Sequence, residues 1–172
     1  MMSLEFEAPL YLLNPIMDLI MDEDAKLQWV YYHEPDNSVV IRVDVARKSL
    51  ETFLLRLASV VTSPVEVTIV DEREEGRFIH EAFLLHVDVG SKSYPVVVML
   101  FYNISKFYPD TIVVGTSDKA PPELIDSVLN LTVGKVKLLD AEMIKSSVID
   151  DGRFIYLRTH LPGSHKGEIL VV

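Results

Sequence analysis

The segment RKSLETFLLRLASVVTSPVEVTIV, residues 47–70, joins a helix signal to a strand signal. Within residues 47–61, apolar residues recur at the spacing of one helical face. These residues are Leu50, Phe53, Leu54, Leu57, Ala58 and Val61. This spacing predicts an amphipathic helix over 47–61. Pro64 ends the helix, and the alternation of Val65, Val67 and Ile69 predicts a strand with one buried face. A helix that leads directly into a strand indicates a mixed fold.

The segments before this helix predict three strands, a hairpin turn and a second helix. Residues 3–8 alternate between apolar and polar side chains, which predicts a strand with one buried face. Asn14-Pro15 places a helix N-cap and a first-turn proline ahead of an apolar run. The turn-forming residues 34–38 separate the runs 29–33 and 39–45, which is typical of a β-hairpin.

Strand signals dominate the chain after residue 70. The run 95–102 is apolar without alternation, so we predict a central strand that is covered on both faces. Pro121-Pro122 predicts the start of a helix, whereas 141–149 fits either a helix or a strand. Further strands are predicted over 77–89, 111–114, 136–139, 154–160 and 168–172. We therefore predict that residues 1–172 form a single α+β domain with a mostly antiparallel, twisted sheet and helices packed mainly on one face.

The tetrapeptide Gly-Arg-Phe-Ile occurs twice, at 76–79 and 152–155, each time after an acidic turn. Segments 39–102 and 111–172 also share an order of strand, helix and three further strands. One hypothesis is therefore an internal duplication of β-α-β-β-β halves. The alternative is two independent hairpins that use the same glycine-terminated turn. If the halves are duplicated, they should have the same strand order.

The composition excludes several classes of function. Lysine and arginine total 16 against 26 aspartates and glutamates, and this net charge of −10 disfavours binding to nucleic acid or to anionic membranes. The absence of cysteine excludes disulfides and thiolate chemistry. No uncharged apolar stretch reaches the ~18 residues of a membrane span, and the first residues lack the basic region of a signal peptide. We therefore expect a cytoplasmic protein.

The chain is also poor in thermolabile side chains. It has no cysteine, one glutamine and four asparagines. This depletion is typical of hyperthermophile proteins, so a thermophilic source is a hypothesis that a melting temperature tests.

Strand alternation predicts one candidate binding face. Ile79 and Ile155 are expected to point into the core, which leaves Phe78 and Phe154 on the opposite side. The titratable and polar residues expected on that side are His80, His86, Asp88, Tyr156, Arg158 and His160. A mixture of aromatic and titratable groups is typical of a small-molecule cleft. The alternative is the more solvated side of an antiparallel sheet.

No metal or cofactor site is predicted. A metal site built from His80, His86 and Asp88 is the alternative, since histidine and carboxylate are ordinary ligands for zinc or iron. Its reach is poor, because residues six positions apart on a strand lie about 20 Å apart, so only His86 and Asp88 could share an ion without other ligands. His33 and His165 fall in predicted turns, where we expect solvated side chains. The chain also lacks a phosphate-cradling Gly-x-x-x-x-Gly-Lys loop and a Gly-x-Ser-x-Gly nucleophile elbow.

The element order from residue 47 onward resembles that of the N-acetyltransferase fold: a helix, three antiparallel strands, another strand, a second helix and final strands. The resemblance covers about two thirds of the chain and rests on element order. It departs from that fold because 103–110 is too short for the long helix after the third strand. Arg73-Glu-Glu-Gly-Arg-Phe78 is similar in part to the Arg-x-x-Gly-x-Gly/Ala pyrophosphate loop, but Phe78 occupies a position that must be small. No residue roles are therefore carried over.

These observations favour a non-catalytic binding or assembly module that forms a homodimer. Tyr31, Tyr32, Val171 and Val172 fall in predicted edge or terminal strands, which a second chain would cover. The alternative is a small-molecule enzyme, acyltransferase-like, that uses the His, Tyr and Arg residues of the candidate face. General acid-base work by a histidine on that face would need a partner such as Asp88 or Tyr156.

Overall fold

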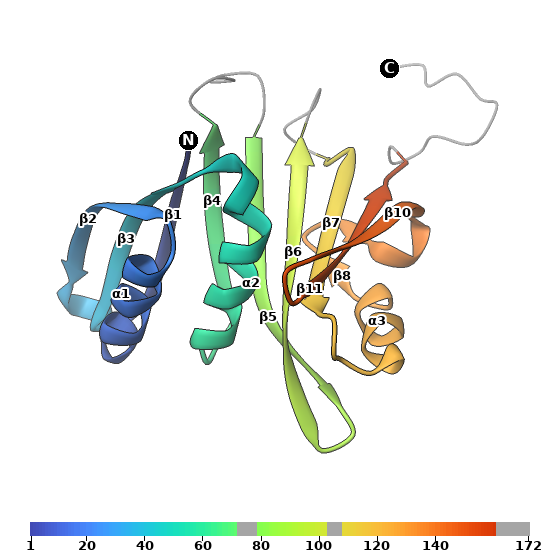
Figure 1. Ribbon diagram of the computed structural model, residues 1–172, viewed down its shortest axis with the longest axis horizontal. Coiled ribbons are helices and arrows are strands. Elements are labelled where there is room, and N and C mark those ends of the chain that lie inside the picture. The colour runs from blue at the N-terminus through green and yellow to red at the C-terminus, as the bar shows by residue number, and fades with distance from the viewer. Residues whose placement is uncertain (72–78, 103–107, 161–172) are drawn as a thin grey trace.

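The computed structural model describes residues 1–71, 79–102 and 108–160, which form one large antiparallel sheet with helices on both faces (Figure 1). The strand order is β10-β11-β7-β6-β5-β4-β1-β3-β2. These strands are β1 (Met2–Pro9), β2 (Ala25–His33), β3 (Ser38–Val45), β4 (Val65–Asp71), β5 (Ile79–Val89), β6 (Lys92–Tyr102), β7 (Thr111–Ser117), β10 (Glu142–Ile149) and β11 (Gly152–Arg158). The mostly antiparallel α+β prediction is confirmed.

The described residues also form three α-helices, which are α1 (Leu13–Asp22), α2 (Leu50–Val60) and α3 (Pro122–Leu129). A separate short hairpin, β8 (Thr132–Val133) and β9 (Val136–Lys137), follows α3. The helix predicted over 47–61 is α2 with a 3₁₀ turn at its start, η3 (Arg47–Ser49). The ambiguous segment 141–149 is the strand β10. None of the described helices is long and apolar enough to cross a bilayer.

The central strand β6 is buried on both faces, as predicted from its unbroken apolar run. Val97 and Met99 belong to the core that also contains the apolar faces of α1 and α2. Val96, Val98 and Leu100 belong to a second core that contains α3 and the β8–β9 hairpin. Because side chains alternate across a strand, these two cores lie on opposite faces of the sheet. The helices are therefore divided between the two faces, rather than gathered on one.

The topology gives the proposed duplication no support. In the first segment, β3 is separated from β4 by β1, which pairs antiparallel with both strands. In the second segment, β7 pairs directly with β11, and two of the strands after α3 form a separate hairpin. The two segments thus differ in strand order. The prediction for 168–172 lies outside the described residues.

Burial on β11 corrects one predicted orientation. Ile155 is buried as expected, but Phe154 is also buried, with an exposed fraction of 0%. Phe154 occupies space that two glycines leave free, since a Cβ added to Gly115 would lie 2.7 Å from its ring and one added to Gly152 would lie 2.8 Å from it. The expectation that Phe154 faces solvent is therefore wrong, because α2 covers this side of β11. The side chains of Phe78 and Ile79 lie outside the described residues.

We predict that Gly115→Ala destabilises the protein by about 1–3 kcal/mol, because the new methyl group would overlap Phe154 and Val97 in a close-packed core. Urea denaturation would measure the free energy of unfolding. Thr68→Ala, at an exposed strand position, should change it by less than about 0.5 kcal/mol. In a Phe154→Leu background the penalty for Gly115→Ala should shrink, and an undiminished penalty would contradict the proposed overlap.

Candidate functional site

The predicted binding residues on β5 and β11 share one face of the sheet but are not brought together. The register connects Ala82 on β5 through β6 and β7 to Tyr156 on β11. By alternation, His80, His86 and Asp88 therefore lie on the same face as Tyr156 and Arg158. Three interstrand spacings separate β5 from β11, which is about 14 Å. His160 follows the end of β11, and α2 packs over the strands between the two groups.

The environments of these six residues differ. His80 is 4% exposed, and its ring lies edge-on to Phe101 with 4.8 Å between the ring centroids. Tyr156 is half-buried, and the Lys145 ammonium lies over its ring. Burial is the larger cause that raises the pKa of the Tyr156 hydroxyl, and the negative charge of Glu51 is the smaller one. His86 is half-buried, whereas Asp88, Arg158 and His160 are exposed. The expectation that His80 faces solvent is wrong, because its face of β5 packs into the core beneath the helices.

Two cavities near the helices are lined by other residues than these six. The first, about 190 Å³, lies between α2 and the sheet and is lined by Thr52, Leu55, Arg56, Ser59, Pro95, Ser117, Ile149, Asp151, Gly152 and Phe154. The second, about 290 Å³, lies beside the start of α3 and includes Asp118, Asp126 and Arg153. Both are smaller than the roughly 300–1,000 Å³ of typical small-molecule sites. They do not join the two groups of predicted residues.

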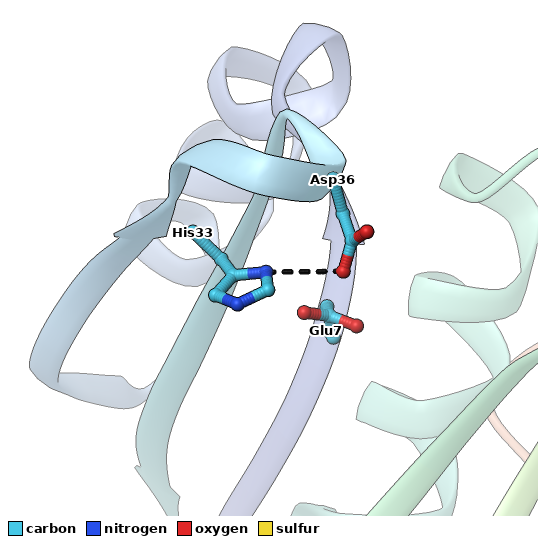
Figure 2. A group of neighbouring side chains, drawn as sticks. All are labelled: Glu7, His33 and Asp36. Atoms are coloured by element: carbon cyan, nitrogen blue, oxygen red, sulfur yellow. Dashed lines mark ion pairs between the residues drawn. The ribbon is translucent and has the colours of Figure 1, made fainter.

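A different cluster forms where the β2–β3 turn meets β1. Glu7, His33 and Asp36 each place one ligand-type atom within 4.8 Å of the others (Figure 2). His33 ends β2, Asp36 lies in the following 3₁₀ turn η2 (Glu34–Asp36), and Glu7 lies on the adjacent part of β1. The antiparallel pairing of β1 with β3 brings Glu7 to the turn, because Glu7 pairs with Val40 and Pro9 pairs with Ser38.

Contacts within and around this cluster fix its geometry. His33 Nδ1 lies 3.0 Å from Asp36 Oδ2, and the His33 side chain is 41% exposed. The buried Ser38 hydroxyl donates a hydrogen bond of 3.0 Å to Glu7 Oε2. Sequence reasoning placed His33 in a solvated turn and missed this cluster. The spacing of His33 and Asp36 was the only local signal, since Glu7 is remote in the sequence.

A second polar cluster lies on the opposite side of the sheet from α2, where Glu66 on β4 approaches Glu81 and Tyr102. The Tyr102 hydroxyl donates a hydrogen bond to Glu81. Burial, and then the hydrogen bond to Glu81, raises the pKa of Tyr102 well above its ordinary value of 10. Desolvation, followed by the charge and hydrogen bond of Glu81, raises the pKa of Glu66. The carboxyl group of Glu66 thus favours its neutral form more than an isolated carboxyl group does.

No protein-family model matches this chain, and neither a curated protein nor a solved structure matches it. The assignment of these clusters therefore rests on their own geometry and chemistry.

We predict that Glu66→Gln stabilises the protein at pH 7. The folded-state pKa of Glu66 is raised above 4.5, so the stability associated with its protonated form is present at low pH and is lost as the pH rises through the folded pKa. The gain from Gln should be at most about 1 kcal/mol, since Glu66 is solvent-exposed. Urea denaturation at pH 7 and near pH 4 would test this, and the gain should shrink at the lower pH. A variant less stable than the wild type at pH 7 would contradict the prediction.

Proposed function

We propose that this protein is a non-catalytic binding and assembly module that forms a homodimer through its edge strand β2. The observation that carries this proposal is the apolar exposure of β2. The exposed fractions of four consecutive residues are 40% for Trp29, 38% for Val30, 60% for Tyr31 and 49% for Tyr32. As an edge strand of the described sheet, β2 also has backbone N–H and C=O groups that no other described strand pairs with on its outer side. A second strand would cover the side chains and pair with the backbone.

The sequence of β2 favours a second copy of the same strand. In a two-fold antiparallel pair centred on Val30, Trp29 of each copy lies opposite Tyr31 of the other. Both side chains lie on one face, since they pair with Arg42 and Val40 of β3. Aromatic cross-strand pairs of this kind stabilise antiparallel sheets.

Near the two ends of β2 this arrangement places Lys26 opposite Glu34, which is a complementary pair, and Asp24 opposite Asp36, which is a like-charge pair. The Lys26 end of one copy approaches the acidic turn of the other copy, which contains Glu34 and Asp36. Lys26 and Glu34 are exposed and available for such a contact. Opposite charges across the pair favour this antiparallel register.

The other edge strand, β10, is a poorer candidate for self-pairing. It also exposes apolar residues, with Met143 exposed by 64% and Val148 by 55%. In an antiparallel pair of β10 strands, however, the Glu142 end of one copy approaches the Asp150-Asp151 turn of the other. These like charges oppose the pairing, and β10 has no aromatic cross-strand pair such as Trp29 with Tyr31 to offset them, so we place the dimer interface at β2.

The small-molecule enzyme alternative has less support. Its candidate residues are spread over two groups about 14 Å apart, and His80 is buried. A thermal shift with acyl-coenzyme A or nucleotides would separate the two functions, since a non-catalytic assembly surface predicts no stabilisation by either ligand.

We predict that the wild-type protein is a dimer at tens of micromolar and that Val30→Lys makes it monomeric, because two lysines would meet at the two-fold axis. Light scattering after size-exclusion chromatography would measure the mass. Val148→Lys on β10 is the matched control and should leave the dimer intact. A monomeric wild-type protein, or a Val30→Lys variant that remains a dimer, would overturn the proposal.

A charge exchange tests the register of the pair. Lys26→Glu should weaken dimerisation by about fivefold or more, because it brings a like charge to the acidic turn. Combining Lys26→Glu with Glu34→Lys should restore much of the affinity. Sedimentation velocity would measure both dissociation constants, and a double variant no tighter than Lys26→Glu alone would contradict this register.

A further inference from the structure

We propose that Glu7, His33 and Asp36 form a binding site for a divalent first-row transition metal, with Zn²⁺ as its probe ion. The three residues come from β1, the end of β2 and the turn η2, which meet at one corner of the sheet (Figure 2). This inference does not depend on the proposed dimer, because all three ligands belong to a single chain.

The spacing of the ligand atoms suits one ion. The three atoms lie within 4.8 Å of one another, and His33 Nδ1 and Asp36 Oδ2 are 3.0 Å apart. Ligands held about 2.1 Å from a Zn²⁺ ion lie roughly 3–4 Å from one another. The observed separations are thus close to those of a coordinated set, and small side-chain rotations would complete it.

The surroundings of His33 Nδ1 also suit a metal ligand. This atom is shielded from solvent, yet no group in the described part of the chain forms a hydrogen bond with it. The nearby Asp36 oxygen makes a close contact in the range of an ion pair but no hydrogen bond. A shielded ring nitrogen usually has a hydrogen-bond partner. A metal ion bound between Nδ1 and the two carboxylates would be coordinated by this nitrogen, which has an ion-pair contact but no hydrogen bond in the described residues.

The charge balance also favours a bound cation. Glu7 and Asp36 bring two carboxylates together, and within residues 1–71, 79–102 and 108–160 neither forms an ion pair with a lysine or an arginine. Their only basic neighbour in the cluster is His33. A divalent ion would neutralise both carboxylates at this corner of an acidic protein.

The surrounding structure holds the ligands in place before an ion binds. Ser38 is 7% exposed, and its hydroxyl orients the Glu7 carboxylate. Asn37 takes the left-handed conformation with φ of 49°, which closes the turn, and its carbonyl accepts a hydrogen bond of 3.1 Å from the Leu10 N–H. The Tyr32 hydroxyl donates to the Asn37 side chain. Such supporting contacts raise the affinity of a metal site.

The donor set indicates the class of ion. One imidazole and two carboxylates suit Zn²⁺ and its first-row neighbours, whereas Mg²⁺ prefers oxygen ligands alone. Three protein ligands leave at least one position for water, as in exchangeable or catalytic zinc sites. The site therefore fits a solvent-accessible ion that binds reversibly.

The test is isothermal titration of the full chain with Zn²⁺ after treatment with a chelator. We expect one Zn²⁺ per chain, and we expect Glu7→Gln, His33→Gln and Asp36→Asn each to weaken binding by about tenfold or more. Ser38→Ala should weaken it by about tenfold by releasing the Glu7 carboxylate. The matched controls His86→Gln and His160→Gln remove histidines outside the cluster and should leave the affinity unchanged. Circular dichroism would confirm that each variant folds.

Three outcomes would overturn the proposal. The first is that the wild-type chain does not bind Zn²⁺ stoichiometrically. The second is that the three ligand variants bind Zn²⁺ as tightly as the wild type. The third is that Mg²⁺ binds as tightly as Zn²⁺ and that His33→Gln does not change the affinity. A shift of the His33 imidazole resonance on addition of Zn²⁺ would support direct ligation. The Val30→Lys variant separates this proposal from the dimer, since it should bind Zn²⁺ like the wild type whether or not a dimer forms.

Discussion

Burial of β6 on both faces is the constraint on which the rest of the structure depends. Residues 96–100 are each at most 1% exposed, and alternate side chains enter two different cores. An antiparallel strand with both faces apolar must be covered from both sides. Helices α1 and α2 cover one side, and α3 with the β8–β9 hairpin covers the other (Figure 1). In this structure that cover includes a helix on each side of the sheet.

The cover on the second side does not extend across the whole sheet. Helix α3 packs against β5, whereas the side chains of Glu66, Thr68 and Val70 on β4 are exposed on that same face. The outer strands β1, β3 and β2 continue beyond β4. The apolar edge of β2 and the Glu7, His33 and Asp36 cluster both lie in this outer part. The two proposals thus concern a part of the described sheet that α3 does not cover, where a partner chain or an ion has access.

The candidate sites show how far sequence reasoning reaches. Alternation predicts which residues of one strand share a face, because it depends only on local backbone geometry. That the predicted residues of β5 and β11 lie on one face of the sheet follows instead from the register through β6 and β7. Alternation did not show that β6 and β7 lie between them, nor that α2 covers His80 and Phe154. The metal cluster was missed for the same reason. Glu7 meets His33 only through the pairing of β1 with β3, which is a long-range contact.

The sequence by itself determined the local elements of this protein: the amphipathic helix α2, the hairpin of β2 and β3, the doubly buried strand β6 and the absence of cysteine chemistry. Hydrophobic periodicity and turn residues act over a few positions, so these features can be predicted from the chain alone. The tertiary structure decided the order of the strands, the face that each helix covers and the neighbours of Glu7. These depend on which apolar faces pack together, and neither local spacing nor the repeated Gly-Arg-Phe-Ile segment specifies that choice.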